Sequence, residues 1–198
     1  MEKMRVVDLV AMGASLIFLL GVAPPAFYQS REIVRRAKCA SNLKRIGDAI
    51  RRYLNDNKGG WFASEKHVQY HRIKLLPPGK KDLLWPDYVD DLEVFICPSN
   101  TKNYPSPMGE YYYEYNYRLR DHVYDDVLYP AITPCVHDTD GYGRNARMDP
   151  EDNHGDEGGH ILFCDFHVKW IHNTEKKQEW YEAIGGTNPT YNFPMRSR

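Results

Sequence analysis

A long apolar stretch close to the N-terminus constrains this chain more than any other feature. Val6 to Phe27 covers 22 residues and contains one charged residue, Asp8. At about 1.5 Å of rise per residue, such a helix spans roughly 33 Å, enough to cross the hydrocarbon core of a membrane. Its most apolar part includes Leu16, Phe18 and Leu20. We therefore predict a transmembrane helix at residues 1–28. A cleaved signal peptide is the alternative, although its apolar core is usually only about 7–15 residues long.

The helical pattern continues beyond the apolar stretch. Pro25 should kink the helix without ending it, because neighbouring groups can satisfy the freed backbone carbonyl. An apolar stripe at helical spacing follows, formed by Leu43, Ile46, Ile50, Tyr53 and Leu54. Residues 57–60, Asn-Lys-Gly-Gly, are a typical stop signal. We expect one long helix, apolar in its first half and amphipathic in its second.

Charge is distributed unevenly along the chain. Residues 1–60 carry 11 basic and 5 acidic side chains, a net charge of +6, and the other 138 residues carry 15 and 22, a net charge of −7. A nucleic-acid-binding protein needs a basic face on its folded part. We therefore expect no nucleic-acid partner, and lipid headgroups or neighbouring subunits fit the basic segment better.

After residue 60 the pattern changes to short β-type segments between turn signals. We predict strands at residues 92–96, 111–117 and 127–132, and a hairpin formed by residues 161–164 and 167–171. The predicted fold class is α+β: a long N-terminal helix packed through its second half on a small antiparallel sheet. Residues 29–198 would form one unit, made of the amphipathic helix and a globular domain.

The N-terminal layout resembles that of type IV pilins and pseudopilins. Asp8 matches the acidic residue near the start of their apolar segment, and Pro25 matches their helix-kinking proline. The segment after Pro25 is more specific, with Arg-Glu, Arg-Arg, Cys39 and then Asn42-Leu43-Lys-Arg-Ile-Gly47. It resembles a large group of prepilin-type proteins common in planctomycetes.

Two further segments resemble the same group. Residues 95–99, Phe-Ile-Cys-Pro-Ser, match its Phe-x-Cys-Pro-Ser pattern. Residues 154–168 resemble its C-terminal processing-associated motif, in which nine residues separate a His from Asp-Gly-His-Val. Here ten residues separate His154 from Asp165, Phe166 replaces the glycine, and His167 follows.

The resemblance implies a structural subunit of a pilus-like filament or of a type II secretion pseudopilus. Its partners would be further copies or other pilin-like subunits. It would sit in the inner membrane by a single pass, with the body outside the cytoplasm, and in a periplasmic or extracellular filament after assembly. The alternative is a non-assembling single-pass envelope protein whose body binds a ligand or a metal.

Processing of the N-terminus stays open. Prepilins are cut after a glycine and then methylated, but Lys3 and Met4 occupy the corresponding positions here.

The four cysteines form no Cys-x-x-Cys pair, which argues against a zinc ribbon. An exported body permits disulfides, and Cys97–Cys135 is the preferred candidate because both residues flank proline-containing loops. Cys39 and Cys164 are then expected to be buried thiols.

An acidic, glycine-rich segment begins at residue 137. Asp138 and Asp140 are candidate ligands for Ca²⁺, although the spacing is not that of an EF-hand, and a solvated turn is the simpler interpretation. No cofactor is expected to be required.

Several histidines raise the question of a metal-dependent enzyme. His137, His154, His160 and His167 lie within about a sixth of the chain. Because no His-Glu-x-x-His and no serine elbow occurs, we predict that the protein is not an enzyme.

Overall fold

A computed structural model describes part of the chain. The described residues are 6–57, 60, 68–69, 72–73, 84, 86–99, 113–116, 119, 122–138 and 153–172. Among them, the side chains of residues 6, 8–10, 16, 18–29, 114 and 156 are left undescribed.

One helix dominates the molecule. Helix α1 runs without interruption from Val6 to Asp56, through both prolines. It ends where the stop signal predicts: the Asn57 side-chain amide donates to the Tyr53 carbonyl at 2.8 Å, and Gly60 has a φ of 62°. The positive φ explains the glycine, because other residues rarely adopt it.

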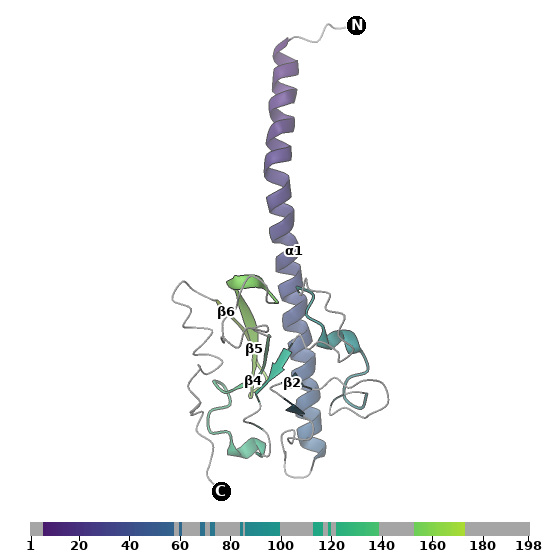
Figure 1. Cartoon of the computed structure of the whole chain (residues 1–198), viewed down its shortest axis with the longest axis vertical. Coiled ribbons are helices and arrows are strands. Elements are labelled where there is room, and N and C mark those ends of the chain that lie inside the picture. Colours follow the sequence, from purple (N-terminus) through teal and green to yellow (C-terminus); the bar gives the residue numbers. More distant parts are fainter. Residues whose placement is uncertain are drawn as a thin grey trace.

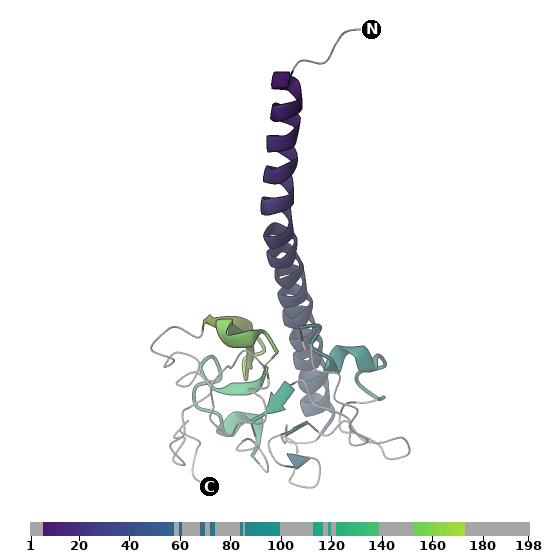
Figure 2. The same ribbon diagram turned by 45° about the horizontal axis from the view of Figure 1, so that its top comes forward.

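The two halves of α1 have different surroundings (Figures 1 and 2). In both views the purple N-terminal half stands clear of the strands, and the bluer C-terminal half lies among them. We call residues 6–29 the projecting half and residues 30–56 the packed half. The strands and 3-10 helices around the packed half form the body.

A membrane crossing at residues 1–28 was expected. Within the described part of the chain, no helix combines the length and the apolar character that a crossing requires.

The described strands form one antiparallel sheet, in the order β1-β2-β3-β4-β5-β6. Its members are β1 (Val68–Gln69), β2 (Arg72–Ile73), β3 (Tyr113–Tyr115), β4 (Pro134–Asp138), β5 (Gly158–Phe163) and β6 (Val168–His172). All six residues of β5 are buried, because this strand lies between two others and packs against α1. Helix and sheet together make an α+β fold, as predicted.

Individual strand predictions had mixed outcomes. The predicted hairpin is present as β5 and β6, and β3 forms within the predicted tyrosine-rich strand. Residues 92–96 are not a strand: Leu92–Phe95 forms the 3-10 helix η1, capped by the Asp91 side chain. Residues 127–132 are not a strand either, since they continue from the 3-10 helix η3 (Tyr124–Asp126) into a turn.

The core lies between the packed half and the sheet. Leu43, Ile46, Ile50 and Leu54 of the predicted stripe are buried, and Tyr53 packs against the same core. Their partners include Val94 and Phe95 of η1, Val136 of β4 and Leu162 of β5. The helical stripe thus fixes the position of α1 on the sheet.

Candidate functional site

The projecting half exposes apolar side chains. Val7, Met12 and Ile17 are exposed there, and Ile33 and Val34 continue the apolar surface into the first turn of the packed half. The residues predicted for assembly lie in the same half of α1, but their side chains are outside the described set: Asp8, Leu16, Phe18, Leu20 and Pro25. Exposed apolar side chains in this arrangement are typical of surfaces that take part in interactions.

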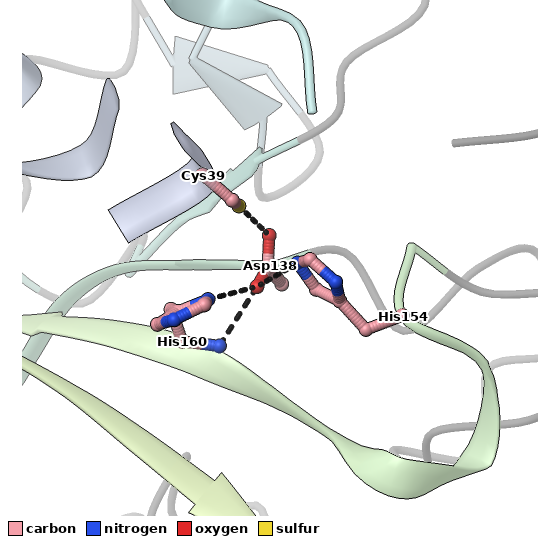
Figure 3. A group of neighbouring side chains, drawn as sticks. All are labelled: Cys39, Asp138, His154 and His160. Atoms are coloured by element: carbon pink, nitrogen blue, oxygen red, sulfur yellow. Dashed lines mark hydrogen bonds and ion pairs between the residues drawn. The ribbon is translucent and has the colours of Figure 1, made fainter. Parts of the chain in front are cut away.

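A second feature lies where α1 meets the sheet. Cys39 of α1, Asp138 at the end of β4, His154 just before the 3-10 helix η4 (Gly155–Glu157), and His160 of β5 point toward one another (Figure 3). All four are buried, and one potential metal-binding atom from each lies within 4.8 Å of all the others. We call these residues the junction cluster.

Asp138 is at the centre of the junction cluster. Its Oδ1 accepts from the Cys39 thiol at 3.1 Å, and its Oδ2 accepts from the His160 backbone amide at 2.7 Å. Nε2 of His154 and Nδ1 of His160 each lie 3.4 Å from Oδ2. Burial opposes ionisation of this carboxyl, but hydrogen bonding with His154 and the nearby His160 outweighs burial and holds its pKa well below the usual range.

His154 is bound on both sides of its ring. Nδ1 lies 2.9 Å from a carboxylate oxygen of Glu32, and Nε2 lies 3.5 Å from the Cys97 sulfur. Burial lowers the pKa of an imidazole, but the hydrogen bonds to Asp138 and Cys97 prevail and raise the pKa of His154 to about 11. The raised pKa of His154 and the lowered pKa of Asp138 both favour a charged pair of imidazolium and carboxylate.

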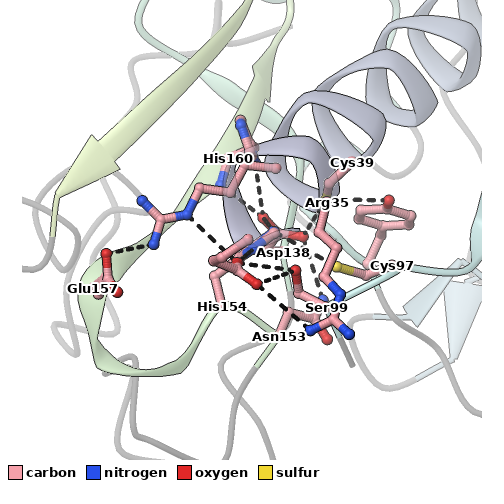
Figure 4. Close-up of polar contacts among 12 residues, drawn as sticks. Arg35, Cys39, Cys97, Ser99, Asp138, Asn153, His154, Glu157 and His160 are labelled. Carbon is pink, nitrogen blue, oxygen red and sulfur yellow. Dashed lines mark hydrogen bonds and ion pairs between the residues drawn. The ribbon is translucent and has the colours of Figure 1, made fainter. Parts of the chain in front are cut away.

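An outer layer of polar groups holds these side chains in place (Figure 4). Glu32 accepts from the Ser99 hydroxyl at 3.0 and 3.2 Å and from Nε of Arg36 at 3.4 Å.

The Arg36 guanidinium also contacts Glu157 and lies 4.3 Å from the centre of the Trp170 ring. Trp170 in turn packs edge-on against the rings of His154 and His160.

All four cysteines are described, buried and free, so the predicted Cys97–Cys135 disulfide is not formed. The thiols lie in two other pairs instead: Cys97 is next to Cys39, and Cys135 is next to Cys164. Burial raises the pKa of Cys39, and the hydrogen bond to Cys135 together with burial raises that of Cys164. The sheet places Cys135 beside β5, next to Cys164 rather than Cys97.

Asn42, Leu43 and Gly47, which belong to the segment after Pro25 that carries the resemblance, are packing positions. The Asn42 side-chain amide donates to the Ile96 carbonyl at 3.0 Å, which ties η1 to α1. Leu43 is fully buried in the core. A Cβ on Gly47 would lie 2.9 Å from Cδ1 of Leu162, so glycine lets the helix approach β5 closely.

Asp165 and His167 shape the turn between β5 and β6. Oδ1 of Asp165 accepts from the His167 backbone amide at 3.2 Å, and the exposed His167 ring stacks on Phe163. Phe166 has a φ of 69°, in the left-handed region that favours glycine. Its ring stacks on Tyr124.

Sequence reasoning identified only part of the junction cluster. It named Cys39, Asp138, His154 and His160 for separate reasons, without predicting that they meet, and it overlooked Glu32. The sequence did contain a signal that could have located the junction cluster, because the three segments that carry the family resemblance meet at this cluster. Glu32 and Cys39 belong to the first segment, Cys97 and Ser99 to the second, and His154 to the third.

The structure describes one of the two predicted calcium ligands. Asp140 lies outside the described residues. Asp138 is described, but its neighbours are a thiol and two imidazoles rather than the oxygen ligands that Ca²⁺ prefers.

Comparison of the chain with protein-family models, with curated proteins and with solved structures found no match.

Proposed function

We propose that this protein is a structural subunit of a pilus-like filament or secretion pseudopilus, assembling through the projecting half of α1. The observation that carries the proposal is the division of one helix into two environments. Ile46 of the packed half is 0% exposed, whereas Ile17 of the projecting half is 74% exposed. A 51-residue helix that leaves an apolar end unburied needs a second partner for that end.

Further copies of the same helix are the partner that fits best. The sequence of the projecting half is mostly apolar and has Asp8 as its one charged residue, which suits the interior of a helix bundle. Before assembly the membrane would hold this half, and in the filament neighbouring helices would replace the lipid. The acidic body would then face outward, where its net negative charge keeps neighbouring filaments apart.

The resemblance of the segment after Pro25, and of residues 95–99 and 154–168, to prepilin-type proteins supports the same function. A non-assembling envelope protein with a ligand-binding body is the competing function, and the junction cluster is the observation in its favour.

Electron microscopy of the purified full-length protein separates the two functions. We expect helical filaments from the wild type and none from Ile17→Asn, because the substitution places a polar amide in the helix bundle. Leu92→Asn is the matched control, since Leu92 is an exposed apolar residue of the body. Detergent-bound monomers from the wild type, or filaments from Ile17→Asn, would contradict assembly through this half.

A further inference from the structure

We propose that the junction cluster binds one divalent transition-metal ion, with Zn²⁺ the best match, through Cys39, Asp138, His154 and His160. This site is independent of filament assembly. It would be structural, joining α1 to the sheet at the point where the helix enters the body.

The spacing of the donor atoms fits a tetrahedral ion. Zn²⁺ lies about 2.0–2.3 Å from its nitrogen, oxygen and sulfur ligands, which puts neighbouring ligands roughly 3.3–3.8 Å apart. The cluster has the Cys39 sulfur 3.1 Å from one oxygen of Asp138, and both imidazole nitrogens 3.4 Å from the other. All four donors lie within 4.8 Å of one another, so small side-chain movements suffice to enclose an ion.

The donor types select among metals. One thiolate, one carboxylate and two imidazoles are typical ligands of Zn²⁺, whereas Ca²⁺ and Mg²⁺ require several oxygens. Charge also balances in this buried site. A thiolate and a carboxylate neutralise the dication, the two imidazoles bind as neutral ligands, and the displaced protons of Cys39 and His154 pass to solvent.

Two side chains are arranged as a metal site requires. His154 presents Nε2 to the cluster and bonds through Nδ1 to Glu32 at 2.9 Å, the carboxylate–histidine arrangement that orients metal-binding imidazoles. Nδ1 of His160 is buried and has no hydrogen bond of normal geometry among the described residues. A bound ion would satisfy that nitrogen.

The position of the ligands predicts what the metal does. They come from α1, β4, the turn before η4, and β5, which are far apart in sequence and brought together only by folding. Because all four ligands are protein side chains and all are buried, no position is left for substrate. The ion would therefore stabilise the docking of α1 and would not catalyse a reaction.

Elemental analysis of the full-length protein, purified in detergent without added metal or chelator, tests the site directly. We expect about one zinc per chain for the wild type. Removal with a chelator should lower the melting temperature, and added Zn²⁺ should restore it. Replacement by Co²⁺ should give the strong visible bands of a tetrahedral site and a thiolate-to-cobalt charge-transfer band.

Two pairs of variants locate the ion. Cys39→Ser should abolish the charge-transfer band, and Cys164→Ser, a buried thiol outside the cluster, should keep it. Glu32→Gln should weaken zinc affinity about 10–100-fold through loss of the partner of His154. Its control is Glu93→Gln, on the exposed surface of η1.

Three outcomes would overturn the proposal. The first is wild-type protein that contains no stoichiometric metal and gives no tetrahedral spectrum with Co²⁺. The second is a Cys39–Cys97 disulfide in the purified protein, which would remove the sulfur ligand. The third is metal binding that Cys39→Ser and Glu32→Gln leave unchanged, since the ion would then lie elsewhere.

Discussion

The projecting and packed halves of α1 are one continuous helix with opposite relations to their surroundings. The packed half buries a narrow stripe from Leu43 to Leu54 against the sheet and leaves charged residues in water. The projecting half exposes its described apolar side chains, including Met12 and Ile17. Hydrophobicity alone therefore does not tell which residues hold the domain together. None of the described side chains of the more apolar half belongs to the core, and the more polar half supplies one whole side of it.

Truncating one isoleucine in each half should give the largest difference in stability between the two halves. Ile46→Ala removes a fully buried side chain and should lower the free energy of unfolding by about 2–5 kcal/mol, because it loses burial and leaves a cavity. Ile17→Ala should change it by less than about 0.5 kcal/mol. Denaturant unfolding of both full-length variants in detergent measures the difference. Similar losses from the two variants would show that the projecting half also packs on the body.

Two glycines offer a second comparison. At Gly47 a larger residue must displace the buried side chain of Leu162, so Gly47→Val should cost about 1–3 kcal/mol. At Gly13 an added Cβ meets nothing within 4 Å, and Gly13→Ala should favour the helix by about 0.5–1 kcal/mol. Thermal melts followed by circular dichroism report both effects. A neutral Gly47→Val would mean that α1 does not approach β5 closely.

The smallest effect is expected where the packed half begins. Arg36 is partly buried, pairs with Glu32 and lies over the Trp170 ring. Arg36→Ala should therefore destabilise the body by about 0.5–1 kcal/mol. Arg31→Ala, an exposed position one turn earlier, serves as the control in the same unfolding assay. Equal effects of the two substitutions would place the start of the packed half nearer the N-terminus.

The sequence predicted the elements whose periodicity is strong. The stripe at Leu43, Ile46 and Ile50 predicted the packed face of α1, and two short β-type segments around Ile161 and Trp170 predicted the hairpin of β5 and β6. Residues 92–96 misled because four of the five are apolar and two of them, Val94 and Ile96, are β-branched. Their buried residues, Val94 and Phe95, are adjacent rather than alternating, and the Asp91 cap starts a 3-10 turn instead.

The candidate site was less predictable for a different reason. Glu32 and His154 are 122 residues apart and form a hydrogen bond only because helix and sheet dock. Periodicity reports which face of a segment is buried, and His160 on the fully buried strand β5 does not stand out from its apolar neighbours. Cys39 and His154 were identified through the family resemblance, but their contact with Asp138 depends on the strand register.

Cysteine cross-linking in intact cells tests the division of α1 most directly. All four native cysteines are buried, so Met12→Cys in the projecting half and Lys44→Cys on the outer face of the packed half each add one accessible thiol. Assembly through the projecting half predicts disulfide-linked dimers from Met12→Cys under mild oxidation and mainly monomers from Lys44→Cys. Monomers from Met12→Cys, or equal cross-linking at both positions, would contradict it.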